Sequence, residues 1–185
     1  MNVIKTKIKD LLIIEPNIFG DDRGFFYETF QAERYKQIGI DLSFVQDNRS
    51  RSSKGVLRGL HFQKNKPQGK LVTVTDGEVF DVAVDLRPKS ETFGQYESIL
   101  LTGENKLQFY VPPGFAHGFC VISNTADFQY KCTDYYDPND ESGLLWSDKE
   151  LKIQWPISTP LLSEKDKVQP TFNEIKKQLI NGWKK

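Results

Sequence analysis

The sequence predicts a mainly β protein, an antiparallel barrel or jelly roll with a few short helices. Three observations favour this fold class. Short runs of β-branched and aromatic residues recur along the 185 residues, turn residues separate these runs, and helical periodicity is scarce. The length fits one domain, so we expect residues 1–185 to form a single domain. With 38% hydrophobic and 27% charged residues, wholesale disorder and collagen-like or disulfide-rich scaffolds are excluded.

The clearest strand signal is "KLVTVTDGEVFDVAVDLR" at 70–87. Two β-rich runs flank Asp76-Gly77, and this pattern predicts a hairpin that turns at these two residues. From 80 to 86, apolar residues alternate with a set that includes Asp81 and Asp85, which predicts one apolar and one partly carboxylate face. We expect the two aspartates to be structural partners of nearby basic residues.

Other segments predict further strands and two helices. A helix is expected over Ala32–Ile38, and a terminal helix over "IKKQLINGW" at 175–183, because Thr171 and Glu174 before it have capping-box spacing. The N-terminal segment "IKDLLIIEPNIF" at 8–19 is apolar and strand-like, and it is suited to pairing with a partner's sheet. The remaining strands are expected over Ser98–Thr102, Leu107–Val111, Gly118–Ile122, Phe128–Thr133 and Leu151–Trp155.

The charges balance overall, with 25 basic and 25 acidic residues, but they are unevenly placed. Positions 48–75 contain no acidic residue and seven lysines and arginines. This asymmetry predicts a positive cleft that holds an anion, with Arg58 and Lys70 as candidates because they lie in apolar runs. Lys64 and Lys66 are better interpreted as a solvated loop. RNA binding competes with this interpretation, but no RNP-like or KH-like motif is present.

Location is indicated by what the sequence lacks. No run approaches the roughly 18 apolar residues that span a bilayer, and the stretch 11–14 is too short for a signal segment. Cys120 and Cys132 lack CxxC spacing, which predicts buried, reduced thiols. We therefore expect a cytoplasmic protein that binds neither nucleic acid nor a membrane.

The two histidines lie in similar contexts, His61 in "GVLRGLHFQ" at 55–63 and His117 in "VPPGFAHGF" at 111–119. Their arrangement resembles the two motifs of cupin barrels. A metal-binding cupin has H-x-H followed by a glutamate, whereas this chain has His61-Phe62-Gln63 and a lysine, Lys70, in the zone of the glutamate. We therefore expect no metal and no cofactor, and His61 is free to act as a base.

Longer motifs resemble one family, the dTDP-4-dehydrorhamnose 3,5-epimerases. The resemblance implies a cupin-like antiparallel barrel that works as a metal-free homodimer on a dTDP-linked 4-keto-6-deoxyhexose. It further implies inversion at carbons 3 and 5, which yields dTDP-4-keto-rhamnose for dTDP-rhamnose biosynthesis. The motifs are "DDRGFFYE" at 21–28, "VQDNRSRS" at 45–52, "GVLRGLHFQ" at 55–63, "PQGKLVTVTDGEVFDVAVDLR" at 67–87, "TFGQY" at 92–96, "VPPGFAHGF" at 111–119, "YKCTDYYDP" at 130–138, "WSDKELKIQWP" at 146–156 and "LSEKD" at 162–166.

The same resemblance implies catalytic roles for four residues. His61 is the base, and Asp166 orients its imidazole and fixes its tautomer. Tyr130 is the acid on the opposite face of the sugar. Lys70 stabilises the enolate oxygen at carbon 4. Read by their immediate context alone, Tyr130 fits a core strand and Asp166 fits a cap before Val168.

The resemblance also implies a set of substrate contacts. Arg58 would bind the diphosphate, and Tyr136 would stack on thymine, although spacing alone leaves Tyr135 as the alternative. The register of Glu141 stays open by one or two positions. The alternative for Arg23 and Glu28 is a surface ion pair between the two. The full set is Arg23, Glu28, Gln46, Asp47, Asn48, Arg58, Lys70, His117, Tyr136, Glu141 and Lys165.

Three other functions remain open at this point. A mono-epimerase that acts only at carbon 3 or carbon 5 would keep the same His, Asp and Tyr residues. A non-catalytic nucleotide-sugar-binding cupin would need neither a base nor an opposing acid. A metal-dependent cupin oxygenase would need ligands that the first motif does not supply.

Overall fold

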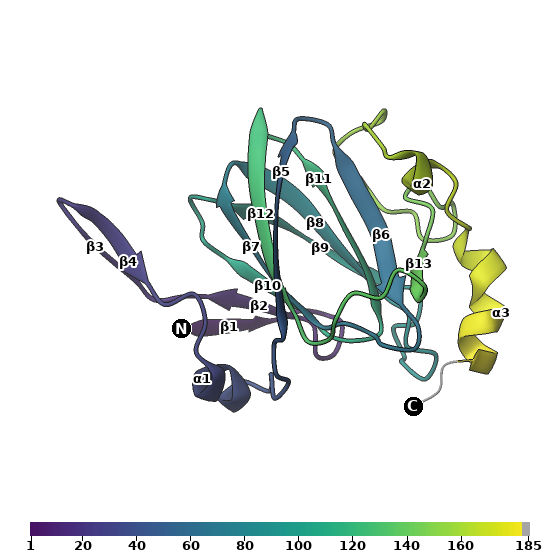
Figure 1. Ribbon diagram of the computed structural model, residues 1–185, viewed down its shortest axis with the longest axis horizontal. Helices are drawn as coiled ribbons and strands as arrows, with labels where there is room; N and C mark the ends of the chain where they lie inside the picture. The colour runs from purple at the N-terminus through teal and green to yellow at the C-terminus, as the bar shows by residue number, and fades with distance from the viewer. Residues whose placement is uncertain (183–185) are drawn as a thin grey trace.

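Residues 1–182 are described by a computed structural model, in which two antiparallel β-sheets face each other (Figure 1). This arrangement confirms the predicted mainly β, jelly-roll fold. The six-stranded sheet has the order β1 (Asn2–Lys5), β2 (Leu12–Glu15), β10 (Gln108–Val111), β7 (Lys70–Asp76), β12 (Thr125–Cys132) and β5 (Gln46–Ser53). The five-stranded sheet has the order β13 (Glu141–Gly143), β6 (Leu57–Gln63), β11 (Phe115–Val121), β8 (Glu78–Asp85) and β9 (Tyr96–Thr102).

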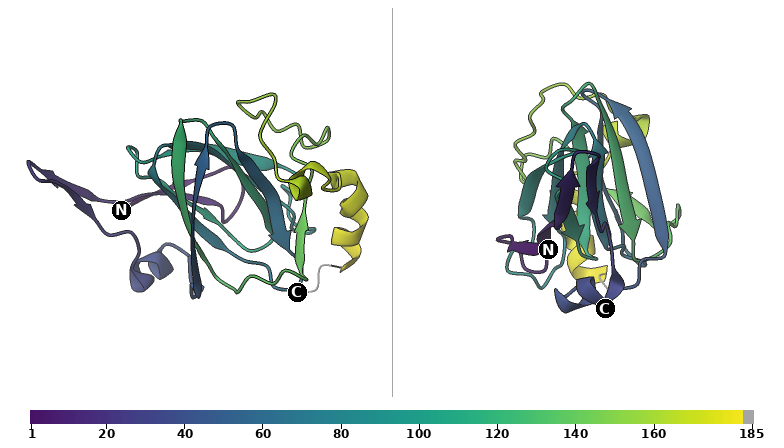
Figure 2. Two further views of the ribbon diagram at one scale, coloured as in Figure 1. Left: turned by 45° about the horizontal axis from the view of Figure 1, so that its top comes forward. Right: turned by 90° about the vertical axis from the view of Figure 1, so that its left-hand side faces the viewer.

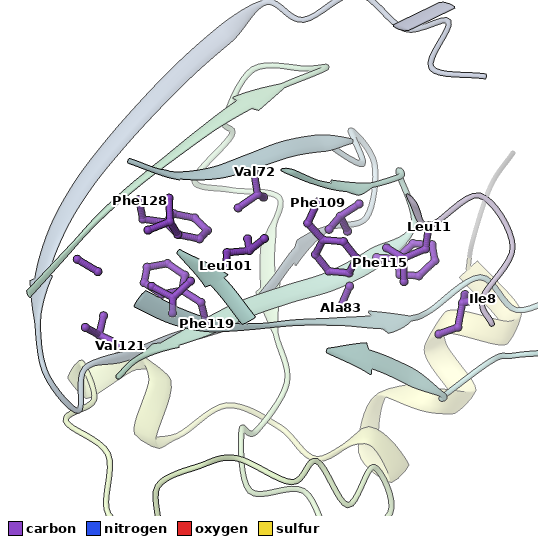
Figure 3. Close-up of a cluster of buried hydrophobic side chains, with 14 residues drawn as sticks. Ile8, Leu11, Val72, Ala83, Leu101, Phe109, Phe115, Phe119, Val121 and Phe128 are labelled. Atoms are coloured by element: carbon purple, nitrogen blue, oxygen red, sulfur yellow. The ribbon is translucent and has the colours of Figure 1, made fainter. Parts of the chain in front are cut away.

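The main hydrophobic core lies between the two sheets (Figure 3). Val72 and Phe109 contribute from the six-stranded sheet, and Ala83 and Phe119 contribute from the five-stranded sheet. Phe119 stacks on Phe128 across the sandwich, with ring centroids 3.9 Å apart. This aromatic pair also borders the pocket described below, so the core forms the floor of that pocket.

The outer face of the five-stranded sheet is covered by the C-terminal part of the chain. Val82 and Val84 of β8 pack in a second buried cluster with Phe172 and Leu179 of helix α3 (Phe172–Gly182). Because β8 is covered on both sides, Asp81 and Asp85 are both fully buried rather than facing water. As expected, each binds a basic residue. Asp81 binds His117, and Asp85 forms an ion pair with Arg87.

The predicted hairpin at Asp76-Gly77 is wrong. β7 and β8 belong to different sheets, so the chain crosses from one sheet to the other at Gly77. A Cβ at Gly77, which has φ +75°, would lie 2.0 Å from the Thr125 carbonyl oxygen, so only glycine fits this crossing. The Glu78 N–H donates to Ser123 Oγ, which fixes the corner to a distant loop. The Asp-Gly pair correctly predicted a turn of the chain, but distant contacts decide with which strands β7 and β8 pair.

The predicted strand over Leu151–Trp155 is also wrong. Its alternating burial is real, because Leu151 is buried and Ile153 and Trp155 are half-buried between exposed residues. Its backbone N–H groups do not follow a ladder: those of Leu151 and Gln154 donate to the Asp148 carboxylate and the Tyr96 hydroxyl, and that of Lys152 donates to the Asp148 carbonyl oxygen. The segment covers the second cluster without joining a sheet.

Both predicted helices are confirmed. Helix α1 spans Ala32–Gln37, and α3 begins after a capping box in which Glu174 accepts from the Thr171 N–H. Trp183, at the end of the predicted terminal run, lies outside the described residues. The four-residue helix α2 (Glu164–Lys167) was not predicted from the sequence. No helix within 1–182 is long and apolar enough to cross a membrane.

A two-stranded hairpin projects from the body of the molecule (Figures 1 and 2). It consists of β3 (Ile18–Asp21) and β4 (Gly24–Tyr27), which form a sheet of their own among the described residues. Phe19, Phe25 and Phe26 are 62–70% exposed on it. A hairpin of this size is marginally stable alone, so its apolar side chains need a covering surface.

Candidate active site

A pocket of about 600 Å³ opens between the two sheets, above the aromatic floor. Inner-face residues of β5, β7 and β12 form one wall, and residues of β6 and β11 form the other. The segment 161–166, which ends in α2, closes one side. The pocket brings together most of the residues singled out in the sequence: Asn48, Arg58, His61, Lys70, His117, Tyr130, Lys165 and Asp166.

His61 and Asp166 form a hydrogen-bonded pair in this pocket. His61 Nε2 lies 2.6 Å from Asp166 Oδ1. Burial alone would raise the pKa of Asp166, but the hydrogen bond and charge of His61 hold it below its usual value. Since an ionised carboxylate only accepts, the proton on His61 belongs on Nε2. Nδ1 is then left as the ring nitrogen that can take up a proton.

Asp166 reaches His61 because the C-terminal segment is tied to the start of β6. Leu161 donates its N–H to Gly55 and accepts one from Leu57. Ser163 then begins α2 as its N-cap, where its hydroxyl accepts from the Asp166 N–H. These local bonds hold the carboxylate against a histidine 105 residues away in sequence.

An irregularity in β6 lets Arg58 and His61 face the same pocket. Residues three apart on a regular strand point to opposite faces, yet both side chains line the pocket. The register between β6 and β11 shifts between His117 and Phe119. Gly59, with φ +117°, lies so close to β11 that an added Cβ would be 2.6 Å from the Gly118 Cα. The glycine therefore permits the placement of both functional side chains.

The opposite wall presents Lys70 and Tyr130. In the sheet, Cys132 lies between Lys70 and Gln46, and Tyr130 lies between Val72 and Asn48. The Lys70 ammonium lies 5.8 Å from the centre of the Tyr130 ring, and within 1–182 neither the ammonium nor the Tyr130 hydroxyl has a hydrogen-bond partner. Burial lowers the pKa of Lys70, while Cys132, Asp81 and Glu141 oppose this shift. Burial raises the pKa of Tyr130, which keeps its phenol protonated.

Arg58 is held without a carboxylate partner. Its Nε and Nη2 both donate to Ser52 Oγ at 3.1 Å, and no ion pair of Arg58 occurs in the described part of the chain. Its charge is therefore available to an anion in the pocket. As expected, Lys64 and Lys66 of the same basic segment do not line the pocket. Lys66 forms an ion pair instead, with its Nζ 3.5 Å from Asp137 Oδ2.

His117 forms a second histidine–aspartate pair, more deeply buried than the first. Its Nε2 lies 2.8 Å from Asp81 Oδ1, and His117 lies directly opposite His61 in the sheet. Burial lowers the pKa of His117 despite the attraction of Asp81, and Lys70 and His61 lower it further. The less buried of the two pairs, His61 with Asp166, is the one better placed to exchange protons with a ligand.

Four of the predicted contacts do not line the pocket: Gln46, Asp47, Tyr136 and Glu141. Glu141 connects Tyr136 to the pocket-lining Lys165, because it accepts from the Tyr136 hydroxyl at 2.6 Å and forms an ion pair with Lys165. This contact raises the pKa of Tyr136 to about 12. Gln46 donates to Asn48 and accepts from the Tyr136 N–H. Asp47 faces the other side of its sheet and pairs with Lys131.

Arg23 and Glu28 lie outside the pocket of their own chain. Arg23 sits at the tip of the β3–β4 hairpin, where it pairs with Asp21, and Glu28 follows the hairpin and pairs with Arg34. Within one chain both therefore form surface ion pairs, but with these neighbours and not with each other, which was the alternative interpretation of the sequence.

Sequence reasoning missed several residues of the site. Arg49 lines the pocket and also binds Asp127 on the outer face, and Ser163 and Ser52 orient Asp166 and Arg58. A serine three residues before an aspartate was a possible capping signal for Ser163. Residues 1–182 contain no group of three or more His, Cys, Asp or Glu side chains that could hold a metal ion.

The arrangement has a definite chemical capacity. An imidazole with a free nitrogen faces, across the pocket, a protonated phenol and an unpaired ammonium. These are the groups needed to remove a proton next to a carbonyl, to stabilise the enolate and to return a proton from the other side. The free arginine nearby suits a phosphate group.

Known proteins resemble this chain over most of its length. Residues 5–174 match the family model of dTDP-4-dehydrorhamnose 3,5-epimerase. The chain is 54% identical over 178 residues to the Escherichia coli (strain K12) protein of that name, covering 95% of this chain and 96% of the relative. A crystal structure of a dTDP-6-deoxy-D-glucose-3,5-epimerase from Legionella pneumophila, in complex with dTDP-4-keto-L-rhamnose, is 57% identical, with a TM-score of 0.93 and 96% coverage of both chains.

Proposed function

The chain belongs to the dTDP-4-dehydrorhamnose 3,5-epimerase family, and we propose that it epimerises dTDP-4-keto-6-deoxyglucose to dTDP-4-keto-rhamnose in the pocket around His61. The observation that carries this proposal is the placement of a base and an acid on opposite walls. His61 lies on the five-stranded sheet, whereas Tyr130 lies on the six-stranded sheet. The product-like ligand of the Legionella relative supports the substrate class.

His61 would remove the protons at carbons 3 and 5 of the hexose. Both carbons flank the ketone at carbon 4, so loss of either proton gives an enolate whose charge rests on the carbon 4 oxygen. The free Nδ1 of His61 takes the proton, and Asp166 stabilises the resulting imidazolium. One base can serve both carbons because each carries a C–H bond next to the same carbonyl group, which makes both protons acidic.

Tyr130 and Lys70 would complete each inversion. The phenol returns a proton to the face opposite His61, which inverts the carbon and regenerates the ketone; His61 then gives its proton to water and Tyr130 takes one from water before the second carbon reacts. The raised pKa of Tyr130 supports this role because the donor must be protonated. The unpaired Lys70 ammonium faces the pocket and would stabilise the enolate oxygen, an interaction worth a few kcal/mol, about 10²–10³ in rate.

The nucleotide would bind between Arg58 and the mouth of the pocket. Arg58 supplies an unpaired guanidinium for the diphosphate, and Lys165 can leave Glu141 to join it. Tyr136 is held through its hydroxyl by Glu141, which supports Tyr136 rather than Tyr135 as the ring that stacks on thymine. Gln46, Asn48 and His117 would supply the remaining polar contacts.

A homodimer would complete the site. The exposed aromatic residues of the β3–β4 hairpin fit a second copy of the chain, because a two-stranded hairpin needs a packing surface. Arg23 and Glu28 do not line the pocket of their own chain. Their proposed contacts with the substrate would therefore be made in the pocket of the partner, and Asp47, which faces outward, would lie toward that partner.

The location of the protein fits this metabolism. Cys120 and Cys132 are both buried and unpaired, which supports a reducing, cytoplasmic environment. A mono-epimerase acting at one carbon is the alternative activity, since a shift of about 1 Å in the pose of the sugar can change a rate a hundredfold.

The experiment compares His61→Ala with Lys66→Ala, a control in the same basic segment that does not line the pocket. Conversion of dTDP-4-keto-6-deoxyglucose is followed by NMR, and dTDP binding by calorimetry. We expect His61→Ala to abolish conversion but retain dTDP binding, and Lys66→Ala to retain both. Conversion by His61→Ala at a rate near that of the wild type would remove His61 from the role of base.

A further inference from the structure

Asp81 occupies an unusual position beside the site. It points into the sandwich from β8, diagonally across from His117 on β11, and its side chain is fully buried. Oδ1 binds His117 Nε2, but Oδ2 is buried and has no hydrogen-bond partner among the described residues. A buried oxygen without a partner costs free energy, so a role other than stability is expected for this carboxylate.

The pairing decides which nitrogen of His117 faces the ligand. A carboxylate only accepts hydrogen bonds, so the proton of a neutral His117 lies on Nε2, toward Asp81. Nδ1 makes no hydrogen bond with the rest of 1–182, and His117 lines the pocket. The ring is fixed on its other side, because it stacks near Phe128 with centroids 6.1 Å apart. The free nitrogen is therefore a hydrogen-bond acceptor held in a defined orientation.

Burial, together with nearby positive charge, favours the neutral form of His117. Three basic side chains surround His117. His61 lies opposite His117 on β6, Arg58 lies opposite Phe119 of β11, and Lys70 faces the same pocket from β7. Burial is the largest cause that lowers the pKa of His117, and the charges of Lys70 and His61 lower it further. The negative charge of Asp81 opposes this shift without changing its direction. A neutral imidazole cannot donate from Nδ1 while its proton is on Nε2.

We propose that Asp81 is a positioning residue that holds His117 in the neutral Nε2–H tautomer, so that Nδ1 accepts a hydrogen bond from a hydroxyl group of the hexose. The diphosphate, the ketone and the enolate oxygen offer only acceptors near neutral pH, so none of them can bind this nitrogen. His117 would then recognise the sugar rather than the phosphates. The assignment of the hydroxyl to a hexose rests on the proposed function, whereas the tautomer does not.

The first test measures the tautomer in the ligand-free wild-type protein. Long-range ¹H–¹⁵N correlation NMR at neutral pH distinguishes a protonated from an unprotonated ring nitrogen. We expect His117 to be neutral, with its proton on Nε2. A proton on Nδ1, whether the ring is neutral or doubly protonated, would overturn the proposal. This measurement needs no variant and no turnover.

The second test compares Asp81→Asn with Asp85→Asn. Asp85 lies on the same strand, is equally buried and binds Arg87 outside the pocket. An amide can donate to Nε2, so Asp81→Asn should move the His117 proton toward Nδ1 and raise the KM for the nucleotide sugar about 10- to 100-fold. Its affinity for dTDP should stay unchanged, and Asp85→Asn should retain the wild-type tautomer and KM. An unchanged tautomer and KM in Asp81→Asn would refute the positioning role.

The third test separates sugar from phosphate by titrating dTDP and dTDP-glucose. We expect dTDP-glucose to shift the His117 Nδ1 resonance in the direction of an accepted hydrogen bond, and dTDP to leave it unchanged. Equal shifts with both ligands, or protonation of Nδ1 by either, would overturn the sugar contact. Failure of both ligands to bind would refute the proposed function and the sugar contact with it, while the ligand-free tautomer would still decide the role of Asp81.

Discussion

Replacement of Asp166 by asparagine tests the catalytic pair with almost no change in shape. The new side-chain amide in Asp166→Asn can donate to His61 Nε2, which would force the proton of the imidazole onto Nδ1, the nitrogen that has to act as the base. The substitution also removes the negative charge that stabilises the imidazolium formed during each proton transfer. Both effects slow the reaction and leave the binding of dTDP unaffected.

The size of the effect follows from the geometry. With charge centres about 4 Å apart and an effective dielectric constant of about 20, the carboxylate stabilises the imidazolium by about 4 kcal/mol. The side chain of His61 is 29% exposed, so solvent screening reduces this to about 2 kcal/mol. Loss of the tautomer preference adds about 2 kcal/mol, the value of a hydrogen bond to a charged group. The sum of about 4 kcal/mol corresponds to a rate about a thousandfold lower.

The assay measures kcat for conversion of the 4-keto sugar and the Kd for dTDP in Asp166→Asn. Asp140→Asn is the matched control, because Asp140 is also buried but binds the backbone N–H groups of Asn65 and Lys66 outside the pocket. We expect only Asp166→Asn to lose kcat. A kcat within tenfold of the wild type, or an equal loss of dTDP affinity, would refute the reasoning.

Three further variants test other parts of the account. Tyr130→Phe should slow product formation about 100-fold or more while loss of the substrate proton continues, as measured by deuterium exchange; equal slowing of both would indicate a positioning role. Burial lowers the pKa of Lys70, so its ammonium stabilises the enolate below that pKa, and this stabilisation is lost as pH rises through it. The alkaline limb of the pH–rate profile should therefore lie below the usual lysine value of about 10.4 and move to higher pH in Lys70→Arg. A limb that does not move would exclude Lys70 as its source. Phe19→Asp with Phe26→Asp should convert a dimer to monomers in light scattering, because both side chains are exposed on the projecting hairpin; a dimer that persists would place the interface elsewhere.

The sequence indicated much of the pocket because its residues carry chemistry in apolar surroundings. Arg58, His61, Lys70 and His117 stood out as charges or histidines within strand-like runs, and the structure brings all four into one pocket. Asp166 could be paired with His61 only through the family resemblance, since 105 residues separate them. The importance of Asp81 was hidden because an aspartate in an apolar strand does not reveal the partner that it meets across the sheet.

The errors in the fold prediction have one physical cause. Local pattern identifies a turn or an alternating segment, but distant contacts decide whether it joins a sheet. Gly77 turns the chain as expected, yet contacts with Ser123 and Thr125 send the two flanking strands into different sheets. Leu151–Trp155 alternates as a strand does, yet the side chains of Asp148 and Tyr96 take two of its backbone N–H groups.

Proton exchange in heavy water tests the central claim most directly. The wild-type protein is incubated with dTDP-4-keto-6-deoxyglucose in D₂O, and deuterium at carbons 3 and 5 is followed by NMR, with the product trapped by a reductase. The base and acid on opposite walls predict deuterium at both carbons together with the rhamno configuration. Deuterium at one carbon only would identify a mono-epimerase, and saturable binding without exchange at either carbon would contradict the proposed chemistry of His61 and Tyr130.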